Sequence, residues 1–582
     1  MKSSYIKINS EKQINLLIIV LVFLIMNNPI KPQEFRETRA VWLATNYRLD
    51  WPPPTFDQKI QIDRLTEIMD DIKDKNLNTV FFQVRSNGTV MFKSSYEPFS
   101  SYFTGQTDNL PDYDPLELAI NLAHKRGLEL HAWLNVTRSY ATSEEKILNH
   151  PKHLYNTHPN WLVKYFEEGK TTYWIDPGLP EARTYIADIV AELVLKYDVD
   201  GIHLDFIRYP GKNFDDDFSY KIYGEGLPID EFRRNNITDI VRQIHDRVKS
   251  IKPFVKIGAA PIGIYKNIEG ARGWEGYFDI YQDSRKWLEL DYADYLAPQI
   301  YWGLDDNPRF DLLAKDWKNN SSGKSIILGI AAYKPEVKTE MESLINYSRE
   351  VGADGVAFFR YENISNYNFL AFDNKAYPSA MPWIDNYNPN PPGNLQYEIV
   401  SSAPDPIIVN LTWDFPKTTS NGNGIAYYAL YKMNDPYQAL EPKNLYEIFS
   451  SDKNRVSLGI EKPRQTKYYF TLKSVDKLWN ESENSSNIIE LTIDNLENIS
   501  SGISSATKSY LVKEGNTFLL MLASNTSQEI EVYGGNGSRD YLLMTRELSV
   551  GRNILFYEKD LSNLSHLKIK YKKSGKEEVL NL

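Results

Sequence analysis

The sequence has no cysteine among its 582 residues and no excess of positive charge. The absence of cysteine excludes disulfide bonds, thiolate metal sites, a cysteine nucleophile and lipid attachment through an N-terminal cysteine. The net charge of −11 argues against nucleic acid as a partner, because phosphate binding requires a basic surface. Uncharged polymers are not excluded as ligands, and the 39 tyrosines and 12 tryptophans weakly favour a carbohydrate.

Long hydrophobic runs are also missing, apart from a short one near the N-terminus. Residues 16–26 form an apolar run of eleven residues that follows Lys2, Lys7 and Lys12. This run is too short to span a bilayer comfortably and fits the hydrophobic region of a signal peptide, although no small-residue cleavage site follows it. We therefore expect residues 1–30 to export the protein to the periplasm, cell surface or medium, either as a cleaved signal or as a retained membrane anchor.

Residues 34–387 repeat a strand-like run followed by a helical pattern eight times. Eight repeats predict an α/β fold of the (β/α)8 TIM-barrel type, with long strand-to-helix loops at 86–113 and 137–180. An open doubly wound sheet is the alternative, but no glycine-rich phosphate loop follows the first strand. The expected strands are 39–45, 79–85, 128–135, 201–206, 255–261, 295–301, 325–330 and 355–359, and the expected helices lie near 58–75, 115–126, 181–197, 229–251, 281–290, 310–318, 336–351 and 363–372.

Two smaller β domains are expected after the barrel. The proline-rich residues 388–393 have the composition of a linker. Residues 391–493 show short alternating runs without a helical period, which predicts a β-sandwich, and their LTW, YYALYK and YYFTLKSVDKLWNES motifs resemble a fibronectin type III module. Residues 495–582 contain further strand-like runs and are expected to form a small β domain.

The segment VDGIHLDFIRYP at 199–210 alternates apolar residues with small or polar ones. Alternate residues of a strand point to opposite faces, and the inner face of a barrel accepts polar residues at its catalytic end. Three other expected strands alternate in the same way, each with polar residues in its C-terminal half. The predicted polar cluster comprises Gln83, Arg85, His131, Trp133, Asn135, His203, Asp205, Gln299 and Tyr301.

Each member of this cluster has a structural interpretation beside a functional one. Arg85 is either the counter-ion of Asp205 or a substrate contact. His131 and His203 lack metal-ligand spacing, so we expect no metal; they would hydrogen-bond sugar hydroxyls or tune the carboxylate. Trp133 and Trp302 would either form the barrel wall or stack on sugars, and Gln299 would face the ligand.

Hydrolysis of a glycosidic bond usually needs two carboxyl groups, of which Asp205 supplies one. The expected partner is Glu97, which follows the second strand between Tyr96 and Phe99 and would act as general acid. Asp283, near the loop after the fifth strand, is the second candidate and would otherwise contact substrate. Asp205 itself could be a structural ion-pair partner.

The motifs RETRAVWLAT, FFQVRSNG, YEPFS, LHAWLN, DGIHLDFIRYP, YQDSRKW and DYLAPQIYW resemble the family 10-like glycosyl hydrolases, the GHL10 group, in the expected order over residues 34–372. The resemblance implies a (β/α)8 barrel in an exported bacterial protein that acts on glycan strands, and similar enzymes cleave peptidoglycan glycan lacking stem peptides. By motif, Glu97 takes the acidic position after the second strand and Asp205 the strand-four position.

We therefore expect a glycoside hydrolase that acts on a polysaccharide, most readily denuded peptidoglycan strands, without a cofactor. Asp205 would be nucleophile or base, and Glu97 the acid. The alternative is a non-catalytic glycan-binding surface protein, which would keep the same polar cluster. A metal-dependent hydrolase using His131, His203 and Asp205 is a weaker third hypothesis.

Overall fold

The computed structural model describes most of the chain from Arg36 onwards. The described residues are 36–141, 150–167, 169–401, 407–416, 424–460, 467–492, 510–514, 517–524, 528–536, 540–548, 551–558, 564–573 and 575–581. The expected export signal at 1–30 lies outside them. Within the described ranges, helices that combine the length and the apolar character of a membrane span are absent.

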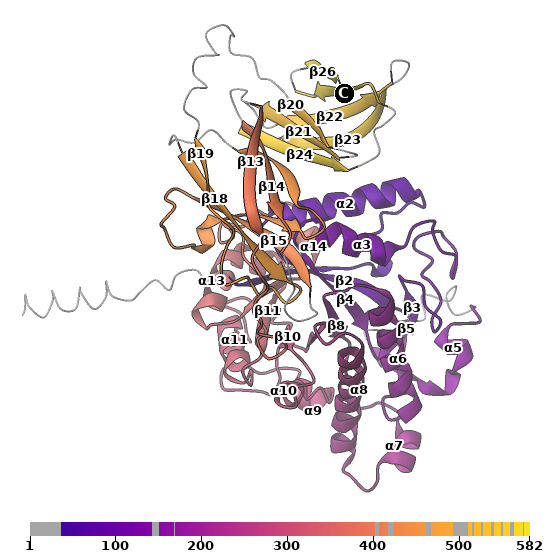
Figure 1. The fold of residues 1–582 in the computed structure, drawn as a ribbon. Helices are drawn as coiled ribbons and strands as arrows, with labels where there is room; N and C mark the ends of the chain where they lie inside the picture. The colour runs from indigo at the N-terminus through magenta and orange to yellow at the C-terminus, as the bar shows by residue number, and fades with distance from the viewer. Residues whose placement is uncertain are drawn as a thin grey trace, which may run out of the picture. The chain divides into compact units, whose positions relative to one another are not determined.

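The chain divides into two compact units, and the barrel belongs to the first. Eight parallel strands close into a ring in which the first strand pairs with both the second and the last. Figure 1 shows β2, β4, β8, β10 and β11 of this barrel among the helices. The predicted TIM barrel is therefore confirmed. Its strands are β1 (Thr38–Leu43), β2 (Thr79–Ser86), β4 (Glu129–Asn135), β8 (Gly201–Asp205), β9 (Lys256–Ala259), β10 (Tyr295–Leu296), β11 (Ser325–Ile330) and β12 (Gly355–Phe358).

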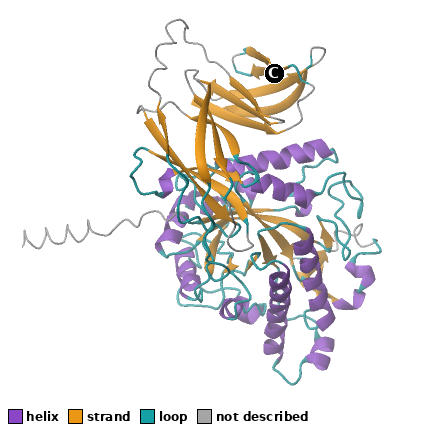
Figure 2. Ribbon diagram, viewed as in Figure 1, coloured by secondary structure: helices purple, strands orange, loops and turns teal. Residues whose placement is uncertain are grey.

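Helices surround the strands on the outside (Figure 2). The helix α2 (Gln58–Asp74) begins at Asp57, whose side chain accepts the Ile60 N–H, and α3 (Pro115–His124) begins at Asp114, which caps in the same way. The helix α2 buries an apolar stripe made by Leu65, Ile68, Met69 and Ile72. The others are α5 (Leu154–Thr157), α6 (Pro180–Lys196), α7 (Asp217–Tyr223), α8 (Ile229–Ile251), α9 (Gly276–Asp279), α10 (Ser284–Glu289), α11 (Phe310–Asn319), α12 (Pro335–Thr339), α13 (Met341–Glu350) and α14 (Tyr361–Ile364).

Several elements differ from the sequence prediction. The expected helix near 363–372 is reduced to the four residues of α14 (Tyr361–Ile364). The expected loop 86–113 contains β3 (Thr89–Val90), which pairs with β2. The strand β10 ends at Leu296 rather than at residue 301, because Pro298 has no N–H to donate to a neighbouring strand. The expected helix 336–351 is split at Glu340 into α12 and α13. The expected long loop 137–180 contains an antiparallel sheet of β5 (Arg138–Ala141), β7 (Lys170–Ile175) and β6 (Leu162–Glu167).

Polar side chains cross the middle of the barrel as one connected chain. Lys256 forms an ion pair with Glu129, whose carboxylate also lies 3.2 Å from Nε2 of His131. Nδ1 of His131 lies 2.7 Å from the Tyr295 hydroxyl, which lies 3.0 Å from Nδ1 of His203. These residues are at most 2% exposed, so the chain satisfies groups that would otherwise be buried without partners.

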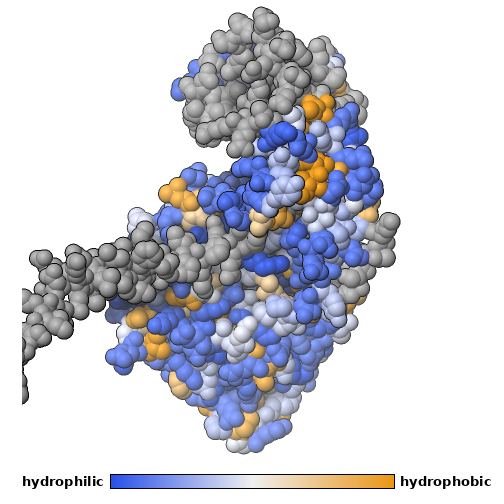
Figure 3. Space-filling model, turned by 60° about the vertical axis from the view of Figure 1, so that its left-hand side comes forward, coloured by the Kyte–Doolittle hydropathy of each residue, from blue (hydrophilic) through white to orange (hydrophobic). Residues whose placement is uncertain are grey.

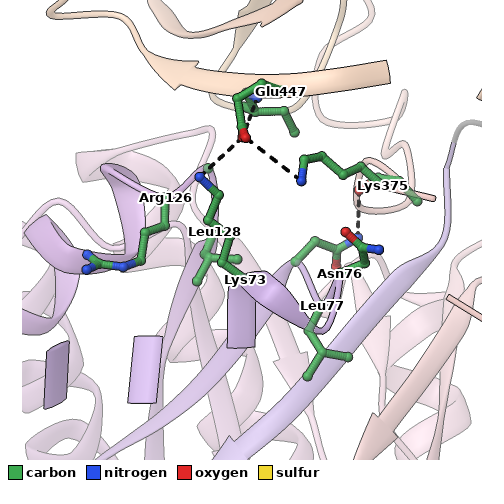
Figure 4. Close-up of a pocket in the computed structure, with 11 residues that line it drawn as sticks. Lys73, Asn76, Leu77, Arg126, Leu128, Lys375 and Glu447 are labelled. Carbon is green, nitrogen blue, oxygen red and sulfur yellow. Dashed lines mark hydrogen bonds and ion pairs between the residues drawn. The ribbon is translucent and has the colours of Figure 1, made fainter. Parts of the chain in front are cut away.

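A second sheet in the first unit packs near the beginning of the barrel strands. It consists of β16 (Leu445–Ser450), β15 (Ile425–Met433), β18 (Lys467–Asp476) and β19 (Ile489–Thr492). Figure 4 shows a pocket there, in which Lys73 and Lys375 reach toward Glu447 of β16. The pocket is also lined by Asn78 and Leu128, which precede β2 and β4, so it lies at the opposite end of the barrel from Asp205.

The second unit contains the remaining sheets, and its boundary passes through the predicted module 391–493. One sheet has the order β13 (Gly393–Ser401), β14 (Ile407–Asp414) and β17 (Arg455–Ile460). The resemblance to fibronectin type III stays a prediction. Two further sheets follow: β20 (Tyr510–Glu514), β21 (Thr517–Ser524) and β24 (Gly551–Glu558), and then β23 (Asp540–Leu548), β22 (Gln528–Gly535), β25 (His566–Tyr571) and β26 (Glu577–Asn581).

The face of the molecule in Figure 3 is largely hydrophilic, with hydrophobic residues scattered in small groups. Exposed large hydrophobic side chains include Tyr437 in a turn and Leu195 on α6. Scattered apolar residues of this kind are ordinary for a protein surface.

The buried pair Glu129–Lys256 gives a stability prediction. Burial favours the neutral form of Glu129, but Lys256 and His131 outweigh it and lower its pKa to about 2. Lys256→Met should cost about 3–5 kcal/mol of unfolding free energy, because it leaves a buried carboxylate unpaired. The double variant Glu129→Gln/Lys256→Met should cost less. Because the pKa of Glu129 is depressed in the folded protein, the stabilisation by this pair should be lost as pH falls from about 4.5 toward 2. Denaturant unfolding measures the effects of the variants and of pH. If the cost of the double variant equals the sum of the two single costs, the coupling between Glu129 and Lys256 is contradicted.

Candidate active site

Asp205 lies at the C-terminal end of β8, inside the barrel mouth. Its Oδ1 accepts the N–H of Phe206 at 2.7 Å and Nε2 of Gln299 at 3.3 Å, and its Oδ2 accepts Nε1 of Trp133 at 3.2 Å. The parallel register of β4 and β8 places Asn135 opposite Asp205 and Trp133 opposite His203. Asp205, Trp133 and Gln299, which the alternation predicted on one face, are therefore in direct contact.

Asp205 is 9% exposed, and burial raises its pKa above the ordinary value. The N–H of Phe206, the charge of Arg208 and the two side-chain donors only partly offset this effect. Among the described residues, Asp205 has no basic side chain within ion-pair distance. A carboxyl group with a raised pKa keeps its proton to a higher pH and is suited to donate it.

Gln83 and Asn135 form the adjoining wall of the mouth. Oε1 of Gln83 accepts the N–H groups of Thr45 and Asn46 at 3.1 and 2.9 Å, and its Nε2 donates to Oδ1 of Asn135 at 3.3 Å. Both amides are buried, at 3% and 5% exposure. Their contacts join the loop after β1 to the end of β4, so they shape the mouth.

Aromatic rings surround Asp205 on the side of β10–β12. Tyr301 is half-buried, and burial raises its pKa well above the usual value, with Asp205 adding to the effect. Its ring lies 5.7 Å from Phe359 and 6.0 Å from Tyr333, whose side chain is 47% exposed. These rings provide an apolar surface beside the carboxyl, which suits the flat face of a sugar ring.

His131 and His203 lie deeper in the barrel than Asp205. Nε2 of His203 accepts from Nε1 of Trp42 at 2.9 Å, and both of its nitrogens are engaged within the barrel. Burial, and then the neighbouring His131, holds the pKa of His203 well below its usual value. Both histidines are thus occupied by protein partners, and within the described residues no cluster of His, Asp and Glu is arranged to hold a metal ion.

Arg85 is paired with Glu97 rather than with Asp205. Its Nε and Nη2 donate to the two Glu97 oxygens at 2.8 and 2.6 Å, and Nη1 donates to the carbonyls of Asn135 and Val136. The interpretation of Arg85 as counter-ion of Asp205 is therefore wrong. A register shift between Gln83 and Arg85 turns the end of β2, so strict alternation fails there.

Glu97 is buried, with 0% of its side chain exposed. Tyr185 of α6 is electrostatically coupled to this pair. Burial raises the pKa of Tyr185, and the charge of Glu97 adds to the rise. Among the described residues, Glu97 has no contact with Asp205. The catalytic role expected for Glu97 stays a prediction, and the structure shows it as half of a bidentate buried ion pair.

Asp283 and Trp302 lie outside the immediate contacts of Asp205. Oδ1 of Asp283 accepts the Tyr265 hydroxyl at 2.6 Å. Trp302 is half-buried and packs against Gly263, where an added Cβ would lie 2.9 Å from the indole ring. Their predicted contacts with substrate stay predictions.

The comparisons with known proteins agree with this geometry. Residues 37–344 match the family described as glycosyl hydrolase-like 10, GHL10. The chain belongs to this family. It is 31% identical over 492 residues to glycosyl hydrolase YngK of Bacillus subtilis, covering 78% of this chain and 93% of that protein. It is 34% identical over 339 residues to glycosyl hydrolase DigH of Escherichia coli, covering 53% and 76%.

Solved structures resemble this GHL10 protein more distantly. One of them is α-L-fucosidase isoenzyme 2 from Paenibacillus thiaminolyticus, with 12% identity and a TM-score of 0.38, covering 90% of this chain and all of that one.

Sequence reasoning missed Arg208, which couples electrostatically to Asp205. Burial lowers the Arg208 pKa to about 10, while Glu167 and Asp205 act in the opposite direction. Arg208 stands in the same VDGIHLDFIRYP motif, but it follows the end of β8, where alternation no longer says which way a side chain points. Tyr333, which follows β11, was missed for the same reason.

The Arg85–Glu97 pair predicts which substitutions affect folding in this GHL10 barrel. Arg85→Met should lower the unfolding free energy by about 3–5 kcal/mol, because it leaves Glu97 buried without a partner. The control is the exposed Arg242 on α8, which pairs with Asp239 and Asp246 of the same helix, and Arg242→Met should cost less than about 1 kcal/mol. Thermal and denaturant unfolding measure both; equal effects of the two variants would show that the buried pair contributes no more than a surface pair.

Proposed function

We propose that this GHL10 protein is an active glycoside hydrolase in which Asp205, expected from the sequence to be nucleophile or base, instead donates the proton to the leaving oxygen. The observation that carries the proposal is a carboxyl group at the barrel mouth whose pKa is raised by burial. Active sites of TIM barrels lie at this C-terminal end of the strands. Protonation of the glycosidic oxygen is the step for which a carboxyl group must still hold its proton near neutral pH.

The surroundings of Asp205 support a sugar ligand. Trp133 and Gln299 donate hydrogen bonds to its carboxyl group and so restrict the directions in which that group can donate its proton. Tyr301 and the exposed Tyr333 offer ring faces, while the amides of Gln83 and Asn135 close one side. A few orienting polar groups among aromatic rings are typical of a carbohydrate-binding cleft.

We further propose that the protein is exported and that its substrate is a bacterial wall glycan, namely peptidoglycan strands without stem peptides. This rests on the resemblance to such enzymes and on the apolar run near the N-terminus. The relatives are named only as glycosyl hydrolases, so the substrate is our inference.

One observation favours the second candidate function, glycan binding without cleavage. A two-carboxylate mechanism needs a partner for Asp205, and Glu97 can serve only if its bidentate pair with Arg85 opens. If the pair stays closed, Glu97 is a positioning residue that fixes the end of β4 through Arg85. A barrel with one reactive carboxyl would then bind a glycan without hydrolysing it.

The test is incubation of the purified protein with denuded peptidoglycan strands and a polysaccharide panel, with released ends analysed by mass spectrometry. Asp205→Asn should lower turnover by about 10²–10⁴-fold, because an amide cannot donate the proton. Asp246→Asn on α8 should leave turnover unchanged. Binding of glycan without any released end would establish the binding function instead.

The pH dependence follows from the raised pKa of Asp205. The donor must be protonated, so turnover should fall as pH rises through that pKa, and this basic limb should lie above the range of an ordinary aspartate. Glu97→Gln should reduce thermal stability and leave the basic limb in place. If instead Glu97→Gln moves or removes that limb in a folded protein, Glu97 is the acid and the assignment to Asp205 fails.

A further inference from the structure

Two arginines lie against the ring of Phe206, the residue that follows Asp205. The guanidinium of Arg138 is 5.2 Å from the ring centroid and that of Arg208 is 5.1 Å from it. Arg138 begins β5, in the small sheet inserted after β4, and Arg208 follows β8. Two elements distant in sequence thus bring positive charge to the edge of the barrel mouth.

Arg208 is held by aromatic rings instead of by a carboxylate. It lies 5.0 Å from the centroids of both Trp174 and Trp274, and the Trp274 side chain is 48% exposed. Within the described residues it donates to the carbonyl of Tyr209 at 3.1 Å, and no acidic group there forms an ion pair with it. Stacking orients the guanidinium, and Glu167 and Asp205 offset its charge only through space, without an ion pair.

Arg138 is also incompletely paired. Its Nε is buried and has no hydrogen-bond partner among the described residues, and its Nη2 lies 3.6 Å from Oε1 of Glu167. That distance exceeds a normal hydrogen bond. Glu167, on β6, is the carboxylate that most strongly offsets Arg208, so one glutamate faces two arginines. A buried donor without a partner is costly unless a ligand or water supplies an acceptor.

The backbone between these arginines is held in an unusual conformation. Phe206 has a φ of +49°, which costs a non-glycine residue about 1–3 kcal/mol. Thr137 stabilises this turn, because its hydroxyl donates to the carbonyl of Phe206 or of Arg208, at 2.5 and 2.6 Å. The surrounding structure thus fixes the turn that connects Asp205 to Arg208.

We propose that Arg208 and Arg138 form a subsite for a carboxylate substituent on the sugar that occupies the barrel mouth. The substrate class is therefore an acidic glycan, such as one carrying a lactyl ether or a uronic acid. Guanidinium groups bind carboxylates through paired N–H donors, and a chain with net charge −11 needs local positive charge to accept an anionic polymer. The proposal rests on the proposed function, since it takes the mouth around Asp205 as the sugar site.

The test is a titration of the full-length protein with a defined tetrasaccharide of alternating N-acetylglucosamine and N-acetylmuramic acid, and with its methylamide, which lacks the charge. Wild-type protein should bind the acid more tightly than the amide. Arg208→Gln and Arg138→Gln should each weaken binding of the acid by about tenfold and binding of the amide by less than about twofold. Arg242→Gln on α8 removes the same charge elsewhere and should change neither.

Each outcome decides the proposal. The proposal is overturned if the wild-type protein binds acid and amide with equal affinity, or binds neither. It is also overturned if Arg208→Gln weakens binding of both ligands equally, which is the result expected if Arg208 only supports the fold. Charge-dependent binding without release of ends from any polymer would support the carboxylate subsite and contradict hydrolysis. Hydrolysis of acid and amide at equal rates would contradict the subsite and leave the proposed function standing.

Discussion

The geometry of the mouth depends on the hydrogen-bonded chain beneath it, whose direction can be worked out from one donor. The indole N–H of Trp42 can only donate, so Nε2 of His203 accepts and Nδ1 of the neutral ring carries the proton. His203 then donates to the Tyr295 oxygen, and Tyr295 donates to Nδ1 of His131. His131 is left to donate through Nε2 to Glu129, which Lys256 neutralises. The position of each shared proton in this hydrogen-bonded chain is therefore determined.

This arrangement matters for Asp205 because His203 lies two residues before it on the same face of β8. A protonated His203 would bring a positive charge beneath the carboxyl and lower its pKa. The donor from Trp42 and the burial of the ring keep His203 neutral instead. The polar interior of the barrel thus removes a charge that would compete with proton donation, while Lys256 and Glu129 cancel each other one layer further down.

The sequence contained enough to predict the barrel and the face on which Asp205 and Trp133 meet, because both follow from periodicity. Gln299 lies beyond the end of β10 and is held by isolated bridges to Ile262 and Gly329. Depth along that face could not be predicted, since His131 and Asn135 share a strand face but only Asn135 reaches the mouth. Alternation failed at Arg85, where a register shift re-aims the side chain toward Glu97. Residues beyond strand ends, such as Arg208, carry no periodic signal, and their placement depends on rings from distant elements.

The proposed carboxylate subsite and the proposed acid would act on each other. Arg208 lowers the pKa of Asp205, although burial has the larger effect. A substrate carboxylate paired with Arg208 would cancel that influence and exclude water from the turn at Phe206, so both changes favour the protonated form of Asp205. The acid would then be more fully protonated in the complex than in the free protein. An acidic substituent would therefore contribute to turnover as well as to affinity, and an uncharged analogue would lose both.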